Sequence, residues 1–254
     1  MVVDSAQIGA IRPEGRVDNN LLRFLKSDDL MLLLPYLKAW AGPADKVLYE
    51  PGDEVRHVYF PCGASLVSYR VALDDRPDVE TLLVGREGAL GGVVSQGRAP
   101  AFARAVVQFP GRFLRMEAVE LEELKLSSVT LRHLFDRYAD CLLAQVFQSV
   151  ACNAVHTIEQ RAAKWMLAAI DRTGDTGLTV TQEQLAGMLG VGRSYVNRII
   201  GSLRARGILA THRGSLWVQD TEALKALACG CNNEVRRHFD DVLAGIYPQP
   251  RRTP

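Results

Sequence analysis

The chain of 254 residues contains no long uninterrupted run of apolar residues. Its longest apolar stretches, around residues 30–34 and 139–155, are too short or are interrupted by polar side chains, whereas a bilayer-spanning helix needs about 20 apolar residues. The first four residues, Met-Val-Val-Asp, are not a basic segment followed by an apolar one. We therefore expect no secretory signal peptide, no contact with a membrane and a cytoplasmic location.

An excess of charge is also missing, because 30 Lys and Arg against 29 Asp and Glu leave a formal net charge of +1. The chain as a whole is thus not basic, and an argument for nucleic-acid binding must come from a local pattern. Cysteine is sparse: there are five, an odd number in a chain too long to depend on disulfide bonds. We therefore expect reduced thiols.

Short β-type runs separated by Gly and Pro fill the segment from residue 46 to residue 116. They cover residues 46–49, 57–61, 64–71, 79–84, 105–109 and 112–116, and a short helix over residues 20–37 precedes them. Such spacing is typical of a sandwich or barrel. Only His57 is a histidine between residues 46 and 116. A cupin-like enzyme, which needs clustered histidine and carboxylate ligands, is therefore disfavoured, and we expect no enzymatic activity.

A long helix is predicted over about residues 128–154, which contain neither Gly nor Pro. Apolar and small side chains recur there every three to four residues. The predicted seam consists of Leu131, Leu134, Phe135, Tyr138, Cys141, Leu142, Gln145, Gln148, Ser149 and Cys152. A rod of roughly 40 Å, at about 1.5 Å per residue, has more apolar surface than one small β domain covers. We expect it to pair with a second copy, the alternative being an ordinary core helix.

Helices with short connections are predicted after residue 157. Thr157 and Gln160 form a capping-box pattern for a helix that ends near Gly174. Residues 182–201 then match a helix-turn-helix, with Thr181 as the N-cap of its first helix. Small Ala186 stands where the two helices cross, and Gly190 stands where the turn needs a positive φ. Apolar residues occupy the packing positions Leu185, Leu189, Val191, Val196 and Ile199.

The charge of this segment agrees with a DNA-binding function. Residues 184–219 contain Arg193, Arg198, Arg204, Arg206 and Arg213 but no acidic residue. Arginine in the second helix can bind guanine, and asparagine can bind adenine, in the major groove. Residues at the start of the first helix are placed for phosphate contacts. The predicted DNA-binding residues are Thr181, Gln182, Gly192, Arg193, Ser194, Tyr195, Asn197, Arg198 and Arg213, the last at the tip of a predicted two-stranded wing over residues 208–218.

This arrangement resembles the Crp/Fnr family of bacterial transcription regulators over roughly residues 20–228. The motif that carries the resemblance is Leu-Thr-Val-Thr-Gln-Glu-Gln-Leu-Ala-Gly-Met-Leu-Gly-Val-Gly-Arg, residues 178–193. It implies a homodimer that pairs through the long helix and places two recognition helices on palindromic DNA. The family's recognition helix typically begins Arg-Glu-x-Val-x-Arg; Arg193, Val196 and Arg198 match, but Ser194 replaces the glutamate. The preferred half-site should therefore differ from that of the cyclic-AMP-dependent members.

The predicted fold is α+β, with an N-terminal antiparallel β-roll or jelly roll, a long dimerisation helix and a C-terminal winged helix-turn-helix. We place a cyclic-nucleotide-binding-like sensor at residues 1–126, the dimerisation helix at 127–156, the DNA-binding domain at 157–228 and a helical extension with a tail at 229–254. The charge divides similarly: residues 1–156 hold 17 basic and 20 acidic side chains, and residues 157–254 hold 13 and 9. A mildly acidic sensor domain would thus be joined to a basic DNA-binding domain.

An effector site is harder to derive from the sequence. The resemblance implies that cyclic-nucleotide members bind ribose through Gly-Glu-x-Ala-Leu and phosphate through a following arginine. The matching region here, residues 85–105, fits that pattern poorly, since Arg104 is one residue out of place and Arg98 comes well before it. The residues considered for an effector are Glu87, Gly88, Leu90, Gly91, Gly92, Arg98 and Arg104. We predict no cofactor and an unidentified signal other than cyclic AMP.

A cysteine and histidine constellation leaves two alternatives open. Cys152 and His156 are four residues apart on one helix face, and Cys229-Gly-Cys231 follows the wing. These donors suit a zinc site or a redox switch, while plain packing of the thiols is the competing interpretation. An N-terminal iron–sulfur cluster is disfavoured because the first cysteine is Cys62.

The function predicted from the sequence is a homodimeric, sequence-specific DNA-binding transcription regulator. Its partners would be double-stranded DNA, a second copy and, if it activates transcription, RNA polymerase. The alternative is a cyclic-nucleotide-binding or metal- or redox-sensing module in which the helix-turn-helix is secondary.

Overall fold

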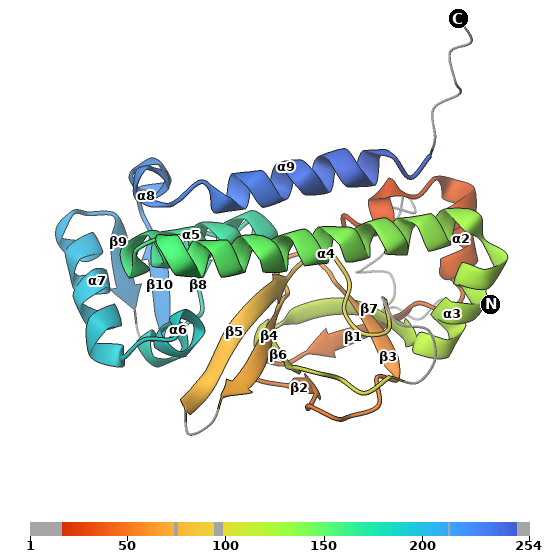
Figure 1. Ribbon diagram of the computed structural model, residues 1–254, viewed down its shortest axis with the longest axis horizontal. Helices are drawn as coiled ribbons and strands as arrows, with labels where there is room; N and C mark the ends of the chain where they lie inside the picture. Colours follow the sequence, from red (N-terminus) through yellow and green to blue (C-terminus); the bar gives the residue numbers. More distant parts are fainter. Residues whose placement is uncertain (1–16, 74–75, 94–98, 213, 248–254) are drawn as a thin grey trace, which may run out of the picture.

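The computed structural model describes residues 17–73, 76–93, 99–212 and 214–247. Figure 1 shows a β-roll beneath a long helix, α4, and a smaller helical domain at one end of that helix. A second helix, α9, runs beside α4. The predicted fold class is confirmed. Among the described residues, no helix is long and apolar enough to cross a membrane.

Two antiparallel sheets form the β-roll. The first has the order β1-β7-β3 and consists of β1 (Lys38–Gly42), β7 (Gly111–Glu117) and β3 (His57–Pro61). The second has the order β2-β6-β4-β5 and consists of β2 (Val47–Tyr49), β6 (Arg104–Phe109), β4 (Leu66–Leu73) and β5 (Arg76–Val84). Side chains from both sheets, including Tyr49, Tyr59, Val67, Val107 and Phe113, fill the space between them.

The N-terminal segment differs from the single helix predicted over residues 20–37. It forms a 3-10 turn, η1 (Leu22–Phe24), and a separate helix, α2 (Ser27–Leu33). The prediction was wrong because Lys26 is extended, with a ψ of 161°, and its N–H donates to the Tyr247 hydroxyl at 2.6 Å. Strand β1 also lies outside the predicted runs.

Helix α4 (Val129–Val155) has the predicted length, 27 residues, and follows α3 (Ala118–Ser127). It begins where expected because the Ser128 hydroxyl accepts a hydrogen bond from the Leu131 N–H. Helix α9 (Cys231–Ala244) runs antiparallel beside it, with the Arg137 guanidinium donating to the Val242 carbonyl at 2.8 Å. The predicted helical extension after residue 229 is therefore present.

The seam that the sequence assigned to pairing packs inside the chain itself. The buried residues of α4 are Leu131, Leu134, Phe135, Tyr138, Cys141 and Cys152. Gln145 donates to the Leu83 carbonyl at 3.2 Å, and Gln148 lies against Cys231. The β-roll and α9 cover this side of α4, so the predicted seam is not free to pair with a second copy. A different stripe, formed by Leu143, Phe147 and Val150, is exposed.

The remaining elements form the winged domain. They are α5 (Ile158–Thr173), β8 (Gly177–Leu178), α6 (Gln182–Leu189), α7 (Arg193–Ala205), β9 (Leu209–His212), β10 (Ser215–Val218) and α8 (Thr221–Leu227). Strand β10 lies between β8 and β9 in a small antiparallel sheet. The capping box of Thr157 and Gln160 is present at the start of α5, as the sequence predicts.

The winged domain and the β-roll share one apolar core. Leu66, Leu83 and Phe109 of the roll belong to the same cluster as Ala162 and Met166 of α5. Polar contacts reinforce this joint: the Trp165 indole N–H donates to Glu80 at 2.7 Å, and the Arg172 guanidinium pairs with Glu87 at 2.8 Å. The two domains are thus packed together rather than linked only by α4.

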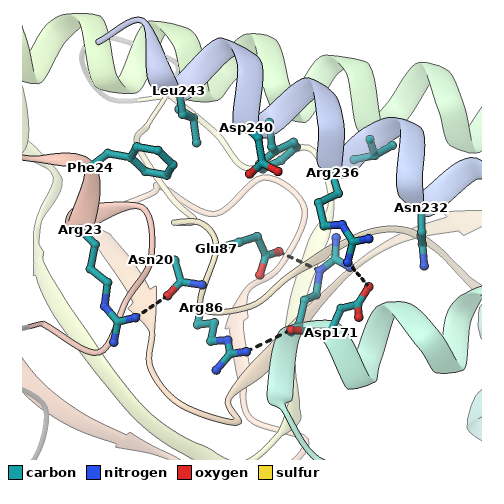
Figure 2. Close-up of a pocket in the computed structure, with 13 residues that line it drawn as sticks. Asn20, Arg23, Phe24, Arg86, Glu87, Asp171, Asn232, Arg236, Asp240 and Leu243 are labelled. Atoms are coloured by element: carbon teal, nitrogen blue, oxygen red, sulfur yellow. Dashed lines mark hydrogen bonds and ion pairs between the residues drawn. The ribbon is translucent and has the colours of Figure 1, made fainter. Parts of the chain in front are cut away.

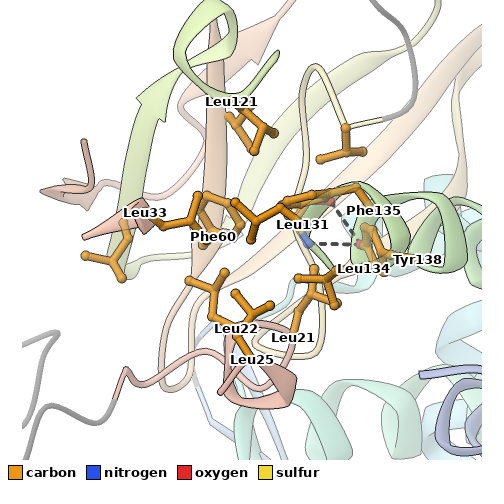
Figure 3. Close-up of a cluster of buried hydrophobic side chains, with 14 of the residues drawn as sticks. Leu21, Leu22, Leu25, Leu33, Phe60, Leu121, Leu131, Leu134, Phe135 and Tyr138 are labelled. Atoms are coloured by element: carbon orange, nitrogen blue, oxygen red, sulfur yellow. Dashed lines mark hydrogen bonds between the residues drawn. The ribbon is translucent and has the colours of Figure 1, made fainter. Parts of the chain in front are cut away.

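Tyr138 joins α4 to the loop after β5 (Figure 3). Its hydroxyl accepts from the Ala89 N–H at 3.0 Å and donates to the Ala89 carbonyl at 2.9 Å, and all of these atoms are buried. Gly88 is required beside it, because a Cβ at that position would collide with the Tyr138 hydroxyl. One phenol therefore satisfies both backbone groups of a buried loop residue.

Replacing Tyr138 with phenylalanine should lower the free energy of unfolding by about 2 kcal/mol, because the Ala89 N–H and C=O lose their partner away from water. Urea denaturation measures this change. The exposed Tyr36 is the control, and Tyr36→Phe should change stability by less than about 0.5 kcal/mol. Equal effects of the two substitutions would contradict this role of Tyr138.

Glu80 makes the stability of the contact between the β-roll and the winged domain sensitive to pH. Burial raises the pKa of its carboxyl from 4.5 to about 7, although hydrogen bonds from Ser68 and Trp165 oppose part of the rise. The folded chain then holds a proton that the unfolded chain releases, so the free energy of unfolding falls as the pH rises from 4.5 to 7.

Glu80→Gln should remove this fall in stability, because the glutamine side chain does not titrate. Its amide oxygen can still accept from Trp165, and its NH2 group can donate to the Ser68 hydroxyl. Urea unfolding below, within and above the window measures the slope against pH. The exposed Glu222 pairs with Lys225 on the surface, and Glu222→Gln should keep the wild-type slope. A wild-type slope in Glu80→Gln would show that another group causes the pH dependence.

Candidate nucleic-acid interface

Helices α6 and α7 form the predicted helix-turn-helix. The Thr181 hydroxyl accepts from the Gln184 N–H at 3.1 Å, and the Gln184 side chain accepts from the Thr181 N–H at 2.9 Å. Gly190 ends α6 with a φ of 68°, the left-handed conformation that the turn needs. The predicted packing positions Leu185, Ala186, Leu189, Val196 and Ile199 are buried, and Val191 is half-buried.

The outer face of α7 is exposed. Arg193, Ser194, Asn197 and Arg198 are exposed on its first two turns. Tyr195 is exposed as well, and the Arg198 guanidinium lies 4.5 Å from the centre of its ring. This cation–π contact holds the arginine against the helix while its N–H donors remain available.

A hollow of about 380 Å³ lies between the start of α6, the start of α7 and the wing. Thr181, Gln182 and Arg193 line it from the helices, and Thr211 and Ser215 line it from β9 and β10. Thr181 accepts through its oxygen as a helix cap, so its hydroxyl hydrogen can still be donated to a phosphate. Gly192, the exposed N-cap of α7, allows a close approach to the backbone here. The predicted Arg213 lies outside the described residues.

Two of the arginines have acidic neighbours that the sequence pattern did not reveal. Arg193 lies 3.5 Å from Glu183, and Arg206 lies 3.9 Å from Glu159. Although residues 184–219 contain no acidic residue, acidic side chains from outside this segment lie close to its arginines in the folded chain. Because the Arg193 and Glu183 side chains are 65% and 78% exposed, water screens their attraction, and a phosphate can displace it.

The predicted effector residues that the structure describes make several separate contacts. Arg104 is held by two carboxylates, Glu50 and Asp78, each at 2.6 Å. Hydrogen bonding to Glu50 is the main reason that the pKa of Arg104 is raised. Glu87 accepts instead from Arg172 of α5, and Arg98 lies outside the described residues.

The other predicted effector residues serve packing. Leu90 is buried between the sheets. Gly91 lies against Tyr49, and Gly92 lies against Ala118. Gly88 faces Tyr138, as described above. A cyclic phosphate needs a fixed cation and free backbone donors together, and the members of this set within the described residues do not offer that combination.

A cavity of about 420 Å³ opens elsewhere, where the β-roll, α5 and α9 meet (Figure 2). Its charged lining residues are Arg23, Arg86, Glu87, Asp171, Arg172, Arg236 and Asp240. The Arg86 Nε and Glu87 Oε2 atoms are buried without a hydrogen-bond partner. Of the seven predicted effector residues, Glu87 lines this cavity. The sequence did not indicate this cavity, because the arginines that line it come from four distant segments.

One further contact was not predicted from the sequence. Arg161 of α5 donates to the Leu189 carbonyl at 3.0 Å and so supports the turn of the helix-turn-helix. The structure also brings together the cysteine and histidine constellation: ligand atoms of Cys152, His156, Cys229 and Cys231 all lie within 4.8 Å of one another.

The comparisons with known proteins agree with this geometry. The family model of the Crp-like helix-turn-helix domain matches residues 160–227. No curated protein sequence matches the chain.

Several solved structures share the fold. FixK2 from Bradyrhizobium japonicum has a TM-score of 0.65 at 15% identity, over 76% of this chain and 98% of its own. TTHB099, a CRP-family transcriptional regulator from Thermus thermophilus, has a TM-score of 0.62 at 21% identity, over 75% and 96%. The c-di-GMP-responsive global regulator CLP of Xanthomonas campestris has a TM-score of 0.60 at 15% identity, over 77% and 100%. The chain thus carries a Crp-like helix-turn-helix domain within the fold of the Crp/Fnr regulators, and the family resemblance indicated by residues 178–193 is confirmed.

Proposed function

We propose that this chain is a sequence-specific DNA-binding transcription regulator that acts as a homodimer in the cytoplasm by binding, not by catalysis. The observation that carries the proposal is the exposed face of α7, where Arg193, Ser194, Asn197 and Arg198 stand beside the hollow at the wing. Arg193 and Arg198 would read guanine, and Asn197 would read adenine. Thr181, Gln182 and Gly192 would contact phosphates, Tyr195 would position Arg198, and Arg213 would reach the DNA from the wing tip.

Pairing of two chains through α4 would complete the DNA-binding unit. Leu143, Phe147 and Val150 recur at intervals of four and three residues, so they share one face of the helix. Phe147 is 64% exposed and Val150 is 65% exposed, which is unfavourable for a lone chain in water. A second α4 on this stripe would bury it and set two recognition helices about 34 Å apart, one turn of DNA.

Regulation would act on the distance between the two recognition helices. We propose a signal other than cyclic AMP, because Arg104 and Glu87 are already paired and aromatic side chains fill the roll. A ligand in the 420 Å³ cavity would contact the roll, α5 and α9 at once, and so could shift the winged domain relative to α4. In an activator, the DNA-bound dimer would then contact RNA polymerase.

Phe147→Asp should convert the dimer into a monomer, because a carboxylate on each copy would be brought into an apolar contact with its own image. Size-exclusion chromatography with light scattering measures the mass. Leu126, which is exposed on α3 away from the stripe, provides the control, and Leu126→Asp should remain dimeric. A monomeric wild type, or a dimeric Phe147→Asp variant, would disprove pairing through this stripe.

Arg198→Ala should weaken binding to DNA and relax the preference at one base pair of each half-site. Sites are first selected from random duplex DNA with the full chain, and affinities are then measured by fluorescence anisotropy at several salt concentrations. We expect two inverted half-sites, a loss of about 1–3 kcal/mol per affected contact and a binding constant that falls with salt.

Arg237, which pairs with Glu234 on the surface of α9, offers the matched control. Arg237→Ala should bind the selected site as the wild type does. If Arg198→Ala keeps both the affinity and the base preference of the wild type, Arg198 is not a base reader. If no sequence is enriched in the selection, the proposed function is wrong.

A further inference from the structure

Four metal-binding side chains from two distant segments meet at the end of α4. Cys152 lies in its last turn, and His156 is its C-cap. Cys229 and Cys231 stand on either side of Gly230, where α8 gives way to α9. The three cysteines are buried, and His156 is half-buried. One sulfur or ring nitrogen from each of the four lies within 4.8 Å of all the others.

The distances are close to those of a tetrahedral zinc site. Zinc–sulfur bonds of about 2.3 Å and zinc–nitrogen bonds of about 2.0–2.1 Å imply ligand separations of about 3.6–3.8 Å. The Cys152 and Cys229 sulfurs are 3.7 Å apart, and the Cys231 sulfur is 3.7 Å from the His156 Nδ1. No two of the four ligand atoms are more than 4.8 Å apart, so metal binding would require no pair to close by more than about 1 Å.

Neither a disulfide nor simple packing explains the cluster equally well. A disulfide needs sulfurs about 2.05 Å apart and would leave the third thiol unused, and all five cysteines of the chain are free. In the described part of the chain, the three thiols form a buried cluster of their own, separate from the aliphatic and aromatic cores. Buried cysteine is common in protein cores, but packing alone requires neither three adjacent thiols nor an imidazole nitrogen 3.7 Å from one of them, whereas a Cys₃His zinc site requires both.

A supporting contact surrounds the donors. The Gln148 side-chain amide, one turn before Cys152, donates to the Cys231 sulfur at 3.1 Å. Hydrogen bonds to a ligating sulfur orient it and favour its metal-bound form. Three sulfurs and one imidazole in a compact arrangement select zinc over magnesium or calcium, which prefer oxygen ligands.

We propose that Cys152, His156, Cys229 and Cys231 bind a single Zn²⁺ through three thiolates and the His156 Nδ1 atom. The metal would tie the last turn of α4 to the turn between α8 and α9. It would thereby brace the corner where the chain leaves the long helix and enters the winged domain at α5. This inference does not depend on the proposed DNA-binding function, and its test does not use DNA.

The test measures zinc in the full-length chain purified under reducing conditions. We expect one zinc per chain by mass spectrometry with elemental analysis, and little in Cys231→Ser and His156→Gln. Cobalt substitution should give the visible absorption of a tetrahedral thiolate site in the wild type. Competition with a chromophoric chelator should show that Gln148→Ala binds zinc about 10-fold more weakly.

Cys141 provides the matched control, since it is buried on the same helix as Cys152 and lies outside the cluster. Cys141→Ser should keep its zinc, and circular dichroism shows which variants fold. His156→Gln, at a half-buried position, tests the site even if a cysteine variant unfolds. The proposal is overturned if the reduced wild type takes up no zinc, if Cys141→Ser loses zinc as Cys231→Ser does, or if a folded His156→Gln variant matches the wild type in zinc affinity.

Discussion

Burial of one face of α4 is the constraint on which the rest of the structure depends. The first half of the helix packs its Leu131, Phe135 and Tyr138 side chains into the core that it shares with the β-roll and α9. Its last turn carries Cys152 into the cluster with Cys229 and Cys231. A helix of this length would not be stable alone, since most helical stability in proteins comes from such packing. The same burial decides which stripe of α4 remains exposed.

Local signals made much of the fold predictable. Ser128, Thr157 and Thr181 each cap a helix through contacts within three residues, so the starts of α4, α5 and α6 could be inferred from the sequence. Gly190 likewise marks the turn of the helix-turn-helix, because a positive φ favours glycine. The exposed residues of α7 followed from helical periodicity alone. The helix-turn-helix part of the candidate site was thus largely predictable.

What the sequence did not predict depends on contacts between distant residues. Arg104 is paired with Glu50 and Asp78, which are 54 and 26 residues away, and no spacing rule indicates such partners. The seam predicted for pairing is covered within the chain, because α9 folds back along α4 and no local pattern in the sequence indicates this. The cavity at the junction draws its arginines from four segments for the same reason. The cysteine constellation was visible as spacing, but only the structure brings its two halves together.

The helix α9 changes the mechanics of the molecule. It is attached to α4 along its length, through Arg137 and the pair formed by His238 and Asp140, and its far end is fastened where Tyr247 meets Asp29. Two rods bonded side by side resist bending far more than one rod does. Under the proposed function, a ligand bound near the β-roll would therefore rotate the two helices as a pair or slide one along the other rather than bend α4 alone. Either motion would displace the winged domain.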